Sequence, residues 1–341
     1  MTAPAAYLDL DRVSDFSFLR GSTIALGAVF EPCIHPQINR LIDILNRNEC
    51  KILLVTNGHN LHRKTIPALF DSDLEMVTFS FDGLTERTYE HIRVGGNYLR
   101  TLDNIEKFRS AFSDAKTLFA INFTIMRYNL DEVSSAPAFW EERDFHIIRY
   151  IAMVVREDDE FLRDNSLWDV RHDYFHALDQ AAEYVVDNRA RISLTSPYFQ
   201  SQQSLARWGG RIQGGVLSSD HPGVRMPRDK DHPREFQYGP DFGMHFPCKS
   251  PFVSARVLWD GTVMLCHNQV IGNLYERSFE EVWNGKLATQ LREKVKNSDA
   301  LCSQCDYFRL CINSHFIDLD KQENYYSQTM LDKHQPRILF S

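Results

Sequence analysis

KILLVTNG at residues 51–58 and LEMVTFSFD at residues 74–82 are the two stretches that decide the fold of this 341-residue chain. Each is a run of apolar and β-branched residues that ends in a polar turn, a pattern typical of a buried strand. A helix is expected between them, near residues 61–70. Strands that alternate with helices form βαβ units, in which neighbouring strands run parallel. The sequence therefore predicts an α/β fold built on a parallel sheet.

The same alternation extends toward both ends of the chain. Further strands are expected at residues 22–29, 118–126, 145–155 and 193–199. Further helices are expected at residues 36–48, 85–92, 99–112, 130–142 and 167–188. No strand is expected before residue 20, so the first strand should leave an unpaired parallel edge on the sheet.

The composition excludes several classes of protein. Thirty-eight Lys and Arg stand against 46 Asp and Glu, which gives a net charge of −8. With 43% apolar and 12% aromatic residues, the chain is neither disordered nor a polycation that would bind nucleic acid. It contains no run of about 18 apolar residues, and its first residues lack the pattern of a secretory signal. We therefore expect a cytoplasmic globular protein with no nucleic-acid or membrane partner.

The seven cysteines are concentrated near the carboxyl end of the chain. Five of them fall between residues 248 and 311, and only Cys33 and Cys50 precede these. In a reducing compartment, a cluster that includes a C-x-x-C pair indicates metal ligation rather than a disulfide framework.

Four of the clustered cysteines can converge on one site. Cys302 and Cys305 form the C-x-x-C pair, which supplies two thiolates from one turn. The Asp260-Gly261 turn is expected to bring the segments of Cys248 and Cys266 alongside each other. Four thiolates suit a zinc ion and an iron–sulfur cluster equally well, so the spacing alone leaves the metal open.

The carboxyl-terminal segments carry a resemblance to a known family. CKSPFVSARVLWDGTVMLCHN at 248–268, IGNLYERSFEEVWNG at 271–285 and CSQC at 302–305 resemble the SPASM/twitch auxiliary-cluster domain of radical SAM enzymes. His315 stands where the longer form of that domain has a further cysteine, so the chain is similar to the shorter, one-cluster form. The resemblance implies one auxiliary [4Fe–4S] cluster, with Cys311 as a spare or alternative ligand and with Cys248, Cys266, Cys302 and Cys305 as the ligands.

The amino-terminal half resembles the barrel of the same enzymes. The resemblance covers about residues 22–155, together with residues 248–311. It implies a partial (β/α)6 TIM-like radical SAM barrel that lacks its first strand, plus a small C-terminal SPASM/twitch cysteine module. The expected organisation is a partial barrel at 1–199, an irregular connection or insertion at 200–247 and an iron–sulfur domain at 248–341.

In that family, S-adenosylmethionine binds at the carboxyl ends of the parallel strands, as ligands do in barrels generally. A carboxylate there could bind the cofactor's ammonium or ribose hydroxyls, and an arginine could pair with its carboxylate. Turn or capping chemistry is the alternative for each residue taken alone, since Asn57-Gly58 and Asp82-Gly83 are ordinary turn pairs. Residue by residue, the matching positions are Glu31, Asn57, Ser80, Asp82, Arg93 and Asn122.

Two features depart from the family pattern. The C-x-x-x-C-x-x-C motif, which holds the cluster that cleaves S-adenosylmethionine, is absent from the sequence. Val29 and Phe30 replace the glycines that precede the family's acidic residue, here Glu31, and would crowd the methionine moiety. The missing motif indicates either a truncated chain or a degenerate protein that has lost the radical chemistry.

Two functions follow as hypotheses. The first is S-adenosylmethionine-dependent radical modification of a peptide, sugar or other small substrate, with an electron-donor protein as partner, in a form that supplies the missing motif. The second is a non-catalytic scaffold that binds a substrate or partner and keeps a structural iron–sulfur or zinc site. Whether the chain is an enzyme stays open, and no catalytic base is assigned, although His59, His62 and His146 lie near the ends of expected strands.

Overall fold

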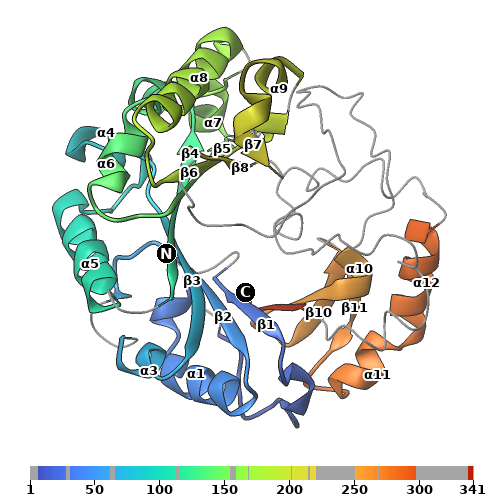
Figure 1. The fold of residues 1–341 in the computed structure, drawn as a ribbon. Coiled ribbons are helices and arrows are strands. Elements are labelled where there is room, and N and C mark those ends of the chain that lie inside the picture. Colours follow the sequence, from blue (N-terminus) through green and yellow to red (C-terminus); the bar gives the residue numbers. More distant parts are fainter. Residues whose placement is uncertain are drawn as a thin grey trace.

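One curved sheet organises the computed structural model (Figure 1). The structure describes residues 7–27, 31–61, 66–112, 116–153, 159–167, 169–200, 202–213, 216–219, 250–266, 269–296 and 337–340. The strands are β1 (Thr23–Leu26), β2 (Lys51–Thr56), β3 (Asp73–Ser80), β4 (Leu118–Ile125), β5 (Ile147–Ala152), β6 (Ser193–Thr195), β7 (Ile212–Gln213), β8 (Val216–Leu217), β9 (Ser254–Val257), β10 (Thr262–Cys266), β11 (Gln269–Asn273) and β12 (Arg337–Phe340). Across these described residues their order is β11-β10-β9-β12-β1-β2-β3-β4-β5-β6-β8-β7.

The strands from β1 to β6 follow one another in the sheet, and each runs parallel to the next. This confirms the α/β fold with a parallel sheet that the alternation of strands and helices predicts. The short strands β8 and β7 continue the sheet beyond β6 in antiparallel pairs. They fall within the expected irregular connection at 200–247, of which residues 220–247 lie outside the described part of the chain. The division into these three segments remains a prediction.

Helices cover the outer face of the parallel strands (Figure 1). The predicted helix at 130–142 is two elements, because Pro137 in the first turn of α6 starts a new helix after η3. The α-helices are α1 (Ile38–Arg47), α3 (Ile66–Phe70), α4 (Glu86–Ile92), α5 (Tyr98–Ala111), α6 (Ala136–Glu141), α7 (Glu160–Asp164), α8 (Arg171–Asp187), α9 (Gln202–Trp208), α10 (Ser250–Val253), α11 (Phe279–Trp283) and α12 (Lys286–Lys296). The 3-10 turns are η1 (Ser17–Leu19), η2 (Pro32–Ile34), η3 (Arg127–Glu132), η4 (Pro197–Gln200) and η5 (Gly209–Arg211).

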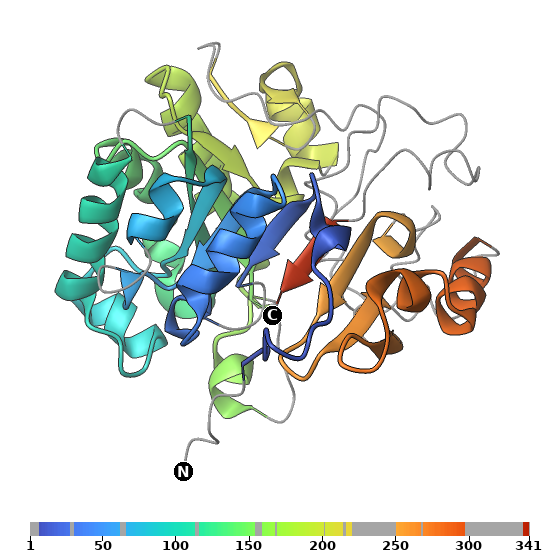
Figure 2. The same cartoon turned by 90° about the horizontal axis from the view of Figure 1, so that it is seen from below.

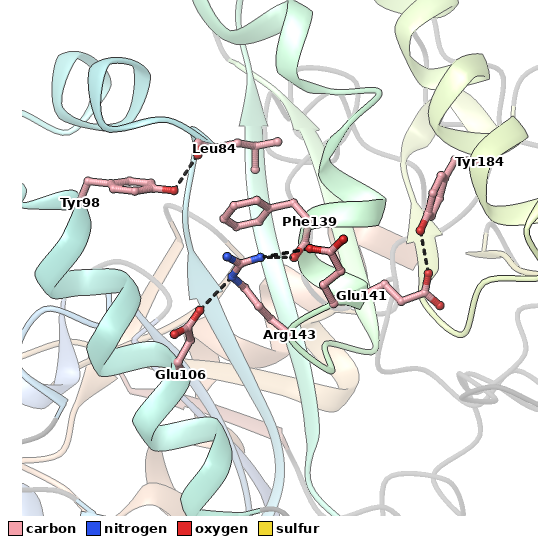
Figure 3. Close-up of polar contacts among 8 residues, drawn as sticks. Leu84, Tyr98, Glu106, Phe139, Glu141, Arg143 and Tyr184 are labelled. Carbon is pink, nitrogen blue, oxygen red and sulfur yellow. Dashed lines mark hydrogen bonds and ion pairs between the residues drawn. The ribbon is translucent and has the colours of Figure 1, made fainter.

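Polar contacts tie the outer helices to one another (Figure 3). Arg143, just after α6, donates from Nε to Glu106 on α5 at 2.9 Å and from Nη1 to the Phe139 carbonyl at 2.8 Å. Tyr184 on α8 donates its hydroxyl to Glu141 on α6 at 3.0 Å. These contacts supplement an apolar interface, so they orient helices whose packing comes mainly from buried aromatic side chains.

The two faces of the parallel sheet carry different cores. Residues that point outward, such as Ile24, Phe79 and Ile148, belong to the large core beneath the helices. Since side chains alternate along a strand, the intervening residues point to the opposite, interior face. There a small separate cluster forms, one residue from each of five neighbouring strands: Ala25, Leu53, Met76, Ala120 and Ile147.

A strand from the carboxyl end of the chain fills the edge that the sequence predicted to be unpaired. β12 pairs in parallel with β1, and Ile24 lies opposite Ile338. On its other side β12 pairs in parallel with β9, and Ile338 lies opposite Ala255. Figure 2 shows β12 between β1 and the C-terminal hairpin. The expectation of an open edge at the first strand is therefore wrong, because residues 337–340 occupy it.

An Ile338→Pro variant tests this pairing. Proline lacks a backbone N–H and is confined to edge strands, so β12 should detach from at least one neighbour. We expect amide hydrogen exchange at Ile24 and Ala255 to accelerate roughly tenfold, while Ile338→Val leaves it unchanged. Hydrogen exchange measured by mass spectrometry or NMR checks this result. Equal protection in the proline variant and the wild type would contradict the central position of β12.

In the part of the chain that the structure describes, no helix combines the length and apolar character required to cross a membrane.

Candidate functional site

Glu31 joins the turn after β1 to the end of β2. Its Oε1 accepts hydrogen bonds from Thr56 Oγ1 at 2.7 Å and from the Cys33 backbone N–H at 3.0 Å. Its Oε2 accepts from the Asn57 backbone N–H at 2.6 Å. Three donors thus already surround this carboxylate, which caps η2 and links two strand ends. Any ligand that used Glu31 would have to share or replace these bonds.

Asn57 forms a local turn at the end of β2. Its Oδ1 accepts from the His59 N–H at 2.9 Å, and the following Gly58 has a φ of +76°. Asn104 on α5 donates from Nδ2 to the carbonyls of Gly58 and His59 at 3.2 and 3.0 Å. The turn is therefore held from two sides, which matches the turn chemistry expected for an Asn-Gly pair.

Asp82 and Arg93 form a buried ion pair at the end of β3. Arg93 Nη2 lies 2.6 Å from Asp82 Oδ2, and Asp82 Oδ1 accepts from the Thr124 backbone N–H at 2.7 Å. Asp82 is only 4% exposed. The pair connects the carboxyl ends of β3 and β4 through the loop after α4, so two of the six candidate positions satisfy each other.

Two further residues support the Asp82 loop, and neither is among the six candidate positions. Asn129 is fully buried and donates from Nδ2 to the carbonyls of Asp82 and Thr124, both at 2.8 Å. Glu132 accepts from the Leu84 N–H at 2.5 Å and from Thr85 Oγ1 at 2.9 Å. Their sequence signal is weak, since an Asn and a Glu after a strand are also common in solvated turns.

A row of polar residues crosses the interior face of the sheet. Ser80 on β3 lies opposite Asn122 on β4, Asn122 lies opposite Arg149 on β5, and Arg149 lies opposite Thr195 on β6. The structure therefore brings the candidates Ser80 and Asn122 together. It adds Arg149, whose signal in the sequence is a single charge within the otherwise apolar and aromatic strand Ile147–Ala152.

Most of the predicted cluster ligands lie outside the described residues. Cys266 is the last residue of β10, immediately before the chain turns into β11. Among the side chains that the structure does describe, no group of three or more His, Cys, Asp or Glu could hold a metal ion. The predicted ligands and alternative ligands that lie outside the described residues are Cys248, Cys302, Cys305, Cys311 and His315.

The two amino-terminal cysteines are buried thiols on separate elements. Cys50 donates from Sγ to the Leu19 carbonyl at 3.1 Å, and burial raises the pKa of its thiol to about 11. Cys33 Sγ lies 3.5 Å from Thr56 Oγ1. A protonated, buried thiol is a poor metal ligand and nucleophile. We therefore assign Cys50 to the hydrophobic core.

Of the histidines considered as bases, His146 is built into the fold and His62 lies outside the described residues. His146 Nδ1 accepts the Phe119 backbone N–H at 3.0 Å. A second histidine, His35, accepts the Gln37 N–H at Nδ1, also at 3.0 Å. Burial lowers the pKa of both rings below the usual 6.5. Both rings are therefore neutral structural acceptors at neutral pH.

These lowered pKa values predict an acid-sensitive fold. The unfolded chain binds more protons than the folded one below pH of about 6.5, so the free energy of unfolding should fall as the pH drops through that value. Urea titrations over a series of pH values measure this slope. A double variant, His35→Gln and His146→Gln, should flatten it. An unchanged slope in the double variant would show that other groups cause the acid sensitivity.

Residues 248–306 match the SPASM family model, which is described as an iron–sulfur cluster-binding domain. The match includes Cys248, Cys266, Cys302 and Cys305, and it ends before Cys311. No curated protein sequence matches the chain.

Solved structures match the fold. SuiB from Streptococcus suis superimposes with a TM-score of 0.53 at 14% identity, which covers 80% of this chain and 57% of SuiB. SuiB bound to its precursor peptide SuiA gives a TM-score of 0.50 at 15% identity, with 79% and 56% covered. The enzyme anSMEcpe, with bound AdoMet and the Kp18Cys peptide, gives 0.54 at 18% identity, with 89% and 80% covered. The chain thus spans little more than half the length of SuiB. These structures therefore share the fold of this chain.

Proposed function

We propose that this chain is an iron–sulfur protein of the radical SAM/SPASM type, with one auxiliary [4Fe–4S] cluster in its C-terminal region and a substrate-binding sheet interior. The match of residues 248–306 to an iron–sulfur cluster-binding domain carries the proposal. It is supported by the interior polar row and by the fold shared with SuiB and anSMEcpe, which were solved with bound peptides. The substrate class is accordingly a peptide or another small molecule.

The donor set fits such a cluster. Four cysteines, Cys248, Cys266, Cys302 and Cys305, lie inside the matched range, and a [4Fe–4S] cluster takes four thiolates. When bound, the cluster would transfer single electrons or hold a substrate. The protein's own contribution would be the β10–β11 hairpin, which fixes the position of Cys266 at the end of a strand.

S-adenosylmethionine fits this chain less well. The sequence contains no C-x-x-x-C-x-x-C motif, so no site for the iron that binds the cofactor is supplied, and we derive no radical step. Glu31 already accepts three hydrogen bonds, and Asp82 and Arg93 neutralise each other. Ser80 and Asn122 are the candidate positions that face the sheet interior. Radical modification of a substrate would require a form of the protein that carries the missing motif.

The ion pair between Asp82 and Arg93 favours a second candidate function, a non-catalytic binding scaffold. In a protein that binds a substrate or partner without cleaving S-adenosylmethionine, the polar groups at the strand ends can serve the turns instead of a cofactor. The paired state of Asp82 and Arg93 is what such a scaffold requires. The cluster would then be structural.

Anaerobic purification and reconstitution test both candidates. We expect about four irons and four sulfides per chain, with no 5′-deoxyadenosine formed from S-adenosylmethionine and dithionite. Formation of 5′-deoxyadenosine, with about eight irons per chain, would refute the scaffold. Stoichiometric zinc in protein purified without added metal, together with failure to assemble a cluster, would refute the iron–sulfur proposal itself.

A further inference from the structure

Arg149 projects into the interior of the sheet from the middle of β5. Its strand neighbours Ile148 and Tyr150 belong to the outer core, whereas Ile147 belongs to the interior cluster. The alternation of side chains therefore places Arg149 on the interior face. In agreement, its Nη2 lies 3.0 Å from the sulfur of Met76, a member of the interior cluster. A cation thus lies on the interior face of the sheet.

This guanidinium is buried, and no counter-ion for it lies among the described residues. Arg149 is 9% exposed, and its Nε has no hydrogen-bond partner in that part of the chain. No carboxylate of the described residues pairs with it, and burial alone lowers its pKa to about 10. A buried, unpaired charge is costly. Such a group is retained in a fold when a ligand, rather than the protein, supplies the missing partner.

A second buried arginine shows what a structural arginine looks like in this chain. Arg292 is 8% exposed, close to the value for Arg149. Its Nε donates to the Pro251 carbonyl at 2.9 Å and its Nη1 donates to the Trp283 carbonyl at 2.7 Å. Arg292 therefore links α12 to neighbouring segments. Arg149 donates to no carbonyl of the described residues, so holding that backbone does not explain its burial.

The neighbours of Arg149 on the interior face are polar and partly unsatisfied. Asn122 Oδ1 is buried without a partner, and so is Ser193 Oγ on β6. Thr195 lies directly opposite Arg149 and is 5% exposed. These groups come from three adjacent strands, which Figure 1 shows side by side. Together they form a polar patch on the sheet interior, here called the Arg149 patch and defined as Asn122, Arg149, Ser193 and Thr195.

We propose that the Arg149 patch binds a carboxylate group of the substrate, a proposal that rests on the proposed substrate-binding role of the sheet interior. The planar guanidinium presents adjacent N–H donors that match the two oxygens of a carboxylate. Arg149 is the only cation of the patch, and a carboxylate carries the single negative charge that balances it. A phosphate monoester would bring a charge of about −2 and leave an uncompensated charge. Arg93 does not compete for this role, since Asp82 already holds it.

Ligand-induced stabilisation of the full chain tests the proposal. Sodium acetate and sodium benzoate are the probes, sodium chloride at equal ionic strength controls for general anions, and acetamide and benzamide are the neutral isosteres. We expect the carboxylates alone to raise the Tm of the wild type. We also expect Arg149→Met to weaken binding of benzoate at least about tenfold, because charge-assisted hydrogen bonds are lost.

The ligand-free variants give a second, independent readout. Because Arg149→Met removes a buried unpaired charge, its Tm should exceed that of the wild type by about 2 °C or more. The matched control, Arg292→Met, removes a bonded arginine of similar burial and should lower the Tm. A lower Tm for Arg149→Met would assign Arg149 a structural role and overturn the proposal.

Three other outcomes would also overturn it. The first is that neither carboxylate raises the Tm of the wild type. The second is that benzoate raises the Tm of Arg149→Met as much as that of the wild type, and the third is that chloride raises the Tm of the wild type as much as the carboxylates do. A loss of S-adenosylmethionine binding in Arg149→Met, without loss of benzoate binding, would assign the residue to the cofactor instead. None of these measurements depends on the metal content. A zinc-loaded protein that binds benzoate through Arg149 would refute the proposed iron–sulfur function and leave this inference standing.

Discussion

Replacing Cys305 by serine will abolish the proposed cluster, leaving less than about one iron per chain where the wild type should carry about four. The C-x-x-C pair supplies two of the four thiolates from one loop, and its loss leaves only three cysteines inside the matched range. Reconstituted protein should then lose the broad visible absorption of the cluster and its EPR signal after reduction. Iron and sulfide assays on the same samples provide the count.

Cysteines elsewhere in the chain provide the matched controls. Cys33→Ala alters a buried thiol near Thr56 on the sheet, and the variant should keep its full iron content. Cys311 lies beyond the matched range, and Cys311→Ala should also keep the cluster. Iron lost in Cys311→Ala but retained in Cys305→Ser would reverse the proposed ligand assignment. Equal iron in all of these variants would show that the metal is bound elsewhere.

Asp82→Ala will lower the free energy of unfolding by about 3–5 kcal/mol, the range for removal of one partner from a buried ion pair. The variant leaves the Arg93 guanidinium, which is itself mostly buried, without a counter-charge. It also removes the acceptor for the Thr124 N–H. Because the lost contacts connect β3 to β4, the damage should fall on the centre of the sheet. Urea denaturation monitored by circular dichroism measures the loss.

An exposed ion pair in the same chain supplies the control for Asp82. Arg191 and Asp144 lie 3.3 Å apart with side chains 65% and 61% exposed. Asp144→Asn, which keeps a residue that tolerates the φ of +57° at this position, should cost less than about 1 kcal/mol, as the loss of an exposed pair does. The double variant Asp82→Ala with Arg93→Met should recover part of the loss, because it removes the uncompensated charge. Equal losses at Asp82 and Asp144 would contradict the buried anchor at the end of β3.

The regular elements of the barrel half were predictable because each depends on a local pattern. KILLVTNG and LEMVTFSFD become β2 and β3, since a run of apolar residues that ends in a polar turn buries both of its faces in a parallel sheet. Thr85 caps α4 through a bond from the Thr88 N–H, a signal that lies within four residues. The predicted strand at 193–199 is shorter, because Pro197 begins a 3-10 turn.

The candidate site was predictable as a set of positions but not as a set of contacts. The resemblance to the radical SAM barrel predicts that Glu31 and Asp82 lie at strand ends. Their partners are Thr56, 25 residues away in sequence, and Arg93, which reaches Asp82 only because α4 folds back. The role of Arg149 was not predictable, because a single charge in an apolar strand indicates no site until its neighbours on β4 and β6 are known.

The sequence by itself determined the parallel α/β fold, and it predicts a set of four cysteines as cluster ligands, because periodicity and ligand spacing are properties of short segments. Only the tertiary structure decided that Ile338 lies beside Ile24 on β1, which closes an edge that the sequence left open. It alone decided that Asp82 is neutralised while Arg149 is not. The physical reason is that pairing and charge compensation depend on which distant segments meet, and that choice is made by the burial of whole elements in a common core.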